Sequence, residues 1–99
     1  MYLVHVHLGR HAHGDLLPGH AAADIAASVA GIPGIEHIVV HSDARPHPIV
    51  GIYLHAKSLR DAESAATDAW MRATVAEPWL RQWEFLRAVA PLPMSDTAW

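Results

Sequence analysis

The chain has 99 residues, a formal net charge of −3 at pH 7 and an apolar content of 52%, which suits a single domain with one core. It lacks a basic cluster, an apolar run of the ~20 residues that a membrane span needs, and any cysteine. These absences exclude a nucleic-acid footprint, a membrane-spanning helix, disulfides, thiolate metal sites and a cysteine nucleophile.

The N-terminus has no basic segment followed by an apolar segment and a small-residue cleavage site. We therefore expect no secretory signal and a cytoplasmic location. Histidine is the residue whose usage is unusual, because the chain contains nine. They are dispersed and do not form one consecutive tag.

Residues 2–8 alternate as a β-strand does. Alternation divides them into one face with Leu3, His5 and His7 and another with Val4, Val6 and Leu8. The second face is typical of a protein core, whereas the first carries two neighbouring imidazoles. A second His-x-His pair, His11 and His13, follows in what we interpret as a loop.

Five further elements are predicted along the chain. They are a helix over about 20–30, strands over 35–41 and 49–56, a helix from an N-cap at Ser58 to about Val75, and a fourth strand over 83–89. A Gly-Ile-Pro-Gly run over 31–34 ends the first helix. The three-residue spacing of Leu80, Trp83 and Leu86 also suits a helix, so residues 79–90 are open to both assignments.

This order resembles the ferredoxin-like α+β fold, β-α-β-β-α-β. The resemblance implies an antiparallel four-stranded sheet in the order 4-1-3-2 with both helices on one face. We expect one domain over residues 1–93 and a tail over 94–99. The resemblance extends to the dimeric α+β barrel proteins, which implies a homodimer and includes cofactor-free monooxygenases and cyclases of aromatic natural products.

The predicted strands place their histidines on one side of the sheet, away from the helices. On that open side we expect Leu3, His5 and His7, then Ile35, His37, Val39 and His41, and finally Ile49, Gly51, Tyr53 and His55. His7 and His41 should meet at one end of the sheet, with His11, His13 and His47 on adjoining loops. The apolar residues among them make this face poorly suited to water.

Three functional interpretations follow from this face. In the first, it is structural: water or a second subunit covers it, and hydrogen bonds satisfy the imidazoles. In the second, it is a metal site for Zn, Cu or Ni, because neutral imidazole suits these ions. The candidate ligands are His5, His7, His37 and His41, closed over by His11 or His13, with Asp15 and Asp43 as further ligands or as hydrogen-bond acceptors.

In the third interpretation, a small organic molecule binds between the face and its dimer mate. His5 and His37 are then the candidate general bases, and Tyr53 would position an aromatic substrate. A module that binds a protein partner through an edge strand or the Trp-rich C-terminal segment is a further alternative. The sequence does not decide whether the protein is an enzyme.

Overall fold

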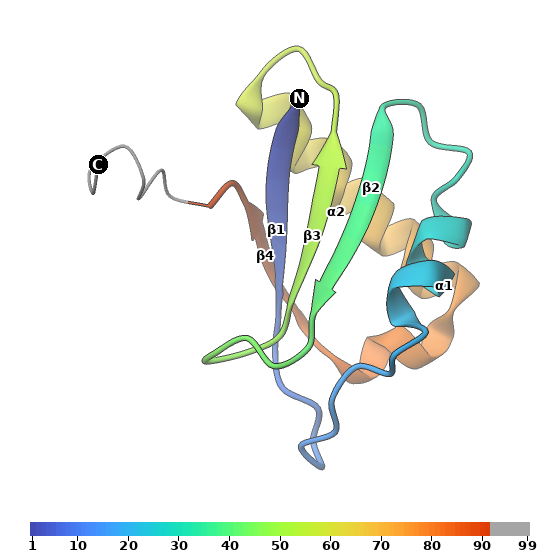
Figure 1. Cartoon of the computed structure of the whole chain (residues 1–99), viewed down its shortest axis with the longest axis vertical. Coiled ribbons are helices and arrows are strands. Elements are labelled where there is room, and N and C mark those ends of the chain that lie inside the picture. Colours follow the sequence, from blue (N-terminus) through green and yellow to red (C-terminus); the bar gives the residue numbers. More distant parts are fainter. Residues whose placement is uncertain (92–99) are drawn as a thin grey trace.

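The structure, a computed structural model, describes residues 1–91; the tail predicted over 94–99 lies outside this range. Its elements in chain order are β1 (Tyr2–Leu8), α1 (Ala21–Ser28), β2 (Ile35–His41), β3 (Ile49–Leu54), α2 (Leu59–Ala76), the 3₁₀ helix η1 (Pro78–Gln82) and β4 (Phe85–Val89). Figure 1 shows α2 crossing behind the sheet and α1 beside the edge strand β2. Neither helix combines the length and the apolar character that crossing a bilayer requires.

The four strands form one sheet in the order β2-β3-β1-β4, and every neighbouring pair is antiparallel. This order is the predicted 4-1-3-2 read from its other edge. With two helices on one face, the protein has the α+β, ferredoxin-like β-α-β-β-α-β fold that the element order predicted. The sheet face away from the helices is called the open face below.

The core lies between the sheet and the helices. Val4, Val6 and Leu8 of β1 have no exposed surface, as the strand alternation predicts. Helix α2 contributes Trp70, which is 2% exposed, and a stripe of small residues, Ala62, Ala66, Ala69 and Ala73. Ser58 caps this helix, since its side-chain oxygen accepts a hydrogen bond from the amide of Asp61 at 3.1 Å.

Three predicted boundaries differ from the structure. The first helix ends at Ser28, about two residues earlier than expected. The third strand ends at Leu54, two residues earlier than expected. Residues 79–90 contain both of the alternatives that the sequence left open, because η1 ends at Gln82 and β4 begins at Phe85. Leu80 is fully buried in η1, whereas Leu86 is 40% exposed at a register shift between β1 and β4.

The prediction that Ile35 lies on the open face is wrong. A register shift between Ile35 and His37 lets Ile35 pair with Leu54 while His37 pairs with Tyr53, so one extra residue is accommodated in β2. Such a bulge reverses the alternation. Ile35 therefore packs against the core, and His37 remains on the open face.

Candidate functional site

The open face is organised as three rows that run across the strands. The first row contains His37, Tyr53 and Leu3; the second contains Val39, Gly51, His5 and Val89; the third contains His41, Ile49, His7 and Arg87. Residues paired across neighbouring strands point to the same side of the sheet. The face therefore brings together His5, His7, His37 and His41, as the sequence predicted for these four positions.

Gly51 leaves space at the centre of this face. A Cβ atom placed there would lie 3.4 Å from Leu3 Cδ1 and 3.8 Å from His5 Cδ2. Both side chains therefore lean over the glycine. Because no side chain stands at position 51, the ring of His5 on β1 comes within 6.2 Å of the ring of His41 on β2, across the intervening β3.

Four imidazoles form a continuous series, here called the histidine row: His41, His5, His7 and His47. Their ring centroids are 6.2 Å apart from His41 to His5, 6.2 Å from His5 to His7, and 5.0 Å from His7 to His47. The last two rings are hydrogen-bonded, with His7 Nδ1 and His47 Nε2 separated by 2.8 Å. One of these two nitrogens must carry the shared proton, and the other must supply a lone pair.

Burial and neighbouring charge favour the neutral form of the two central rings. The pKa of His5 lies below its ordinary value, chiefly because the ring is partly buried and secondly because His41 is near. Burial is also the largest cause of the lowered pKa of His7, followed by the charges of Arg87, His47 and His5. Neutral imidazoles have a lone pair that a metal ion or an acidic hydrogen can use.

These shifts predict a pH-dependent stability. Because the folded pKa values of His5 and His7 lie below the unfolded value of about 6.5, the unfolded chain binds more protons as the pH falls through that region. The free energy of unfolding should have its full value above about pH 6.5 and should decrease as the pH falls below that point. Urea denaturation between pH 7.5 and pH 5 measures this decline.

A His5→Gln/His7→Gln variant is the matched control for this measurement. It removes the two shifted groups and keeps seven of the nine histidines. Its free energy of unfolding should therefore fall less steeply with decreasing pH than that of the wild type. Equal slopes in the two proteins would contradict the assignment of the pH dependence to these rings.

Other predicted residues lie at the opposite end of the open face or beyond it. The rings of His37 and Tyr53 are 6.0 Å apart, and Tyr53 is 36% exposed. His55 follows the end of β3, and its Nε2 lies 3.5 Å from a carboxylate oxygen of Glu36. His37 and Tyr53 are therefore close to each other but outside the histidine row.

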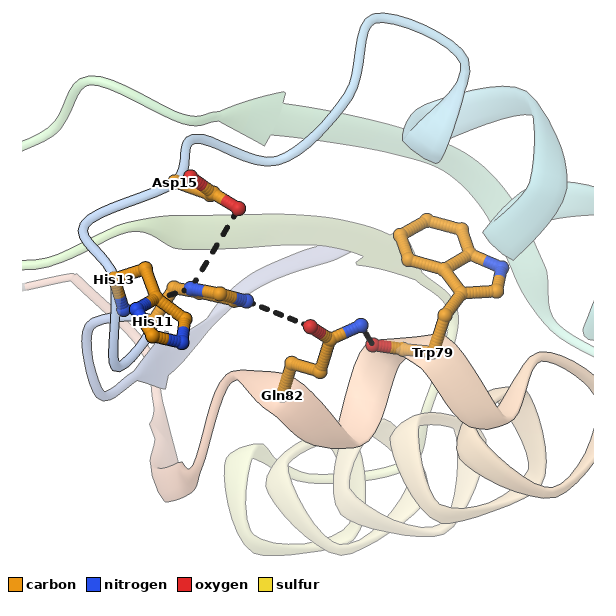
Figure 2. A network of polar contacts seen from close by, with 5 residues as sticks. All are labelled: His11, His13, Asp15, Trp79 and Gln82. Carbon is orange, nitrogen blue, oxygen red and sulfur yellow. Dashed lines mark hydrogen bonds and ion pairs between the residues drawn. The ribbon is translucent and has the colours of Figure 1, made fainter.

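His11 is held away from the open face by contacts with η1 (Figure 2). Its Nε2 donates to Gln82 Oε1 at 2.6 Å, and its Nδ1 accepts from the backbone amide of His13 at 3.0 Å. Because Nδ1 accepts that hydrogen, the Asp15 carboxylate 3.7 Å away receives no hydrogen bond from it. Both ring nitrogens of His11, which is 8% exposed, are thus already in use.

A cavity of about 310 Å³ lies beside His47, between the loop that follows β1 and the loop that joins β2 to β3. Its walls include Asp15 and Asp43, together with Arg10, Arg45 and one side of His47. The two aspartates that the sequence suggested as additional ligands therefore line this cavity. His47 is the residue that connects the cavity with the histidine row.

His47 is the site residue that sequence reasoning undervalued. The sequence places it on a loop at this end of the sheet, as it does His11 and His13, but only those two are counted among the candidate ligands. The available signal was its position between Pro46 and Pro48, immediately before β3. Within residues 1–91, no three side chains of His, Asp or Glu are gathered closely enough to hold a metal ion together.

Comparison with protein-family models, with curated proteins and with solved structures finds no match for this chain.

Proposed function

We propose that this chain is a ligand-binding domain whose site is the histidine row on the open sheet face. The proposed ligand is a divalent transition-metal ion, Zn, Cu or Ni, bound first by His7 and His47. One observation carries this proposal: His7 Nδ1 and His47 Nε2, 40 positions apart in the sequence, lie 2.8 Å from each other. The two rings share one hydrogen in this contact, and an ion would take its place between them once the ring that carries the hydrogen holds it on its other nitrogen.

The neighbouring groups support the same ligand. The lowered pKa values of His5 and His7 keep their rings neutral, which is the form that coordinates a metal. The ring of His5 is 6.2 Å from that of His7 and is the nearest open-face imidazole on the same strand. His11 is a poor ligand because both of its nitrogens are engaged, so we leave it outside the proposed site.

Calorimetric titration with Zn, Cu and Ni at pH 7.5 tests the proposal. We expect a dissociation constant below about 100 µM for at least one ion, and a loss of about tenfold or more in His7→Ala. The matched control is His20→Ala, because His20 is exposed beside α1, where its ring lies 5.5 Å from that of Trp79 and pairs with Asp24 at 2.7 Å, outside the histidine row. Binding weaker than 100 µM, or equal in His7→Ala, would refute the metal site.

A second candidate function is supported by the other end of the face. There, His37 and Tyr53 stand 6.0 Å apart, and His5, with its lowered pKa, lies in the adjoining row. This arrangement suits a cofactor-independent enzyme of the dimeric α+β barrel type, in which a histidine is the general base and Tyr53 positions an aromatic substrate. Full activity of His37→Ala or Tyr53→Phe on a natural substrate would exclude these roles.

We further propose that two copies of the chain pack through their open faces, and that the protein works in the cytoplasm. The half-buried side chains of Leu3, Val39, Ile49 and Val89 support the pairing, since together they form an apolar surface with no helix over it.

A further inference from the structure

The proposed metal site is incomplete in one chain. His7 and His47 supply two nitrogens, and residues 1–91 contain no group of three ligating side chains. A structural Zn²⁺ ion takes four ligands in a tetrahedral arrangement. Residues 1–91 of the same chain do not supply the two remaining ligands.

The spacing of the pair is close to what such an ion requires. Zn–N distances of about 2.0–2.1 Å at tetrahedral angles place two nitrogens about 3.3 Å apart. The observed separation of 2.8 Å between His7 Nδ1 and His47 Nε2 would have to widen by about half an ångström. His47 lies on a loop and is half-buried, so its ring can make that adjustment without moving a strand.

A second copy of the chain can supply the missing ligands. In a two-fold symmetric dimer, the same patch of surface occurs on both sides of the interface, and a group near the axis meets its own copy. His7 occupies the third row of the open face, which is the unpartnered apolar surface of the sheet. Two His7–His47 pairs that meet at the axis provide four nitrogens.

The charges on the face permit this approach. Among its positions in the described residues, Arg87 is the one with a formal charge, and it lies on the edge strand β4 next to His7. Arg87 is exposed, so its long side chain can extend into water when a cation binds. Since the described part of the face carries no further formal charge, two copies can meet without the repulsion that two acidic or two strongly basic faces would have.

The area of the sheet explains why the ion would matter. Four strands about 4.8 Å apart and about six residues long give a face of roughly 19 by 20 Å, or about 400 Å² in projection. A stable interface buries about 800 Å² on each partner. The open face alone is therefore small for a permanent dimer, and a shared metal ion would add the missing stabilisation.

We propose that two copies of this chain, packed through their open faces, bind one Zn²⁺ ion between two His7–His47 pairs. This inference rests on the proposed function and specifies its stoichiometry and its partner. It also predicts that dimerisation and metal binding are linked, because the four ligands of the ion come together only when two chains pair.

Calorimetry and light scattering of the full chain, with Zn²⁺ added and then removed by EDTA, test the inference. We expect one ion per two chains and a mass about twice the 10.8 kDa of one chain, returning toward the monomer with EDTA. His7→Ala and His47→Ala should each lose both effects, whereas His20→Ala should keep them. His47→Gln should also lose both effects, and its circular dichroism spectrum distinguishes loss of the ligand from loss of the fold.

The outcomes separate the two proposals. One ion bound per chain at monomer mass, with affinity lost in His7→Ala, would overturn the shared site but retain the metal-binding function. A Zn²⁺-dependent dimer that persists in His47→Ala would also overturn the shared site, because other ligands would then hold the ion. A folded wild-type protein that binds no Zn²⁺ would overturn the shared site, and one that binds none of the Zn, Cu and Ni ions would overturn both proposals.

Discussion

Replacement of Trp70 by alanine is expected to lower the free energy of unfolding by about 3–5 kcal/mol. Trp70 is the largest fully buried side chain and lies on α2, which packs over β1 and β3. Its helix otherwise offers alanines to the core, and these small side chains cannot move into the space that the indole would leave. Urea denaturation at pH 7.5 measures the loss.

Met71→Ala is the matched control for this prediction. Met71 is the next residue of the same helix, but its side chain is 47% exposed. Its replacement should change the free energy of unfolding by less than about 1 kcal/mol, as exposed substitutions usually do. A loss below about 1.5 kcal/mol in Trp70→Ala would mean that the sheet and α2 are not packed around this residue.

The effects of removing His7 and His47 on Zn²⁺ affinity should not add. If both nitrogens bind the same ion and two chains share it, His7→Ala or His47→Ala removes two of the four ligands and costs about 100-fold in the dissociation constant, or about 2.8 kcal/mol. The second substitution then removes only the two weak contacts that remain. His7→Ala, His47→Ala and the double variant should therefore have similar affinities.

Calorimetric titration of the three variants and the wild type completes this cycle. His20→Ala combined with His7→Ala is the control, because an exposed histidine outside the row should leave the single variant's affinity unchanged. A loss of about 10⁴-fold in the double variant, which is the product of the two single losses, would contradict this prediction. It would indicate that His7 and His47 contribute independently to binding and do not act as a unit, despite the 2.8 Å between their nitrogens.

Most of the fold could be predicted from local patterns. The alternation of β1 separates Val4, Val6 and Leu8 from the histidines, and the structure buries these three completely. The element order then determines the strand order, since a β-α-β-β-α-β chain has few compact arrangements. The predicted helix starts and stops needed only small corrections, because glycine, proline and Ser58 mark them in the sequence.

The errors arose where position depends on tertiary pairing. The bulge at Ile35–His37 cannot be recognised from residues 35–41 alone, because it is defined by the partners Leu54 and Tyr53 on another strand. Leu80 and Leu86 belong to one series of apolar residues spaced three apart, yet Leu80 lies in η1 and Leu86 lies in β4. In this segment, packing of Leu80 against the core competes with pairing in the sheet. Short apolar runs are therefore ambiguous between helix and strand.

The candidate site was predictable only in part for a related reason. His5, His7, His37 and His41 could be assigned to one face because a strand has a fixed period. His47 and His11 lie in loops, where no period indicates a direction. The structure joins His47 to His7 and turns His11 toward Gln82, and neither contact follows from spacing in the sequence.

The central claim is that the ligand binds to the imidazoles of the histidine row at His7 and His47. Long-range ¹H–¹⁵N NMR spectra of the imidazole rings, recorded during a Zn²⁺ titration, test it most directly. We predict that the ring-nitrogen signals of His7 and His47 change first, while those of His20 and His55 stay constant. Changes confined to His11, His13 or His20, with His7 and His47 unchanged, would contradict the claim.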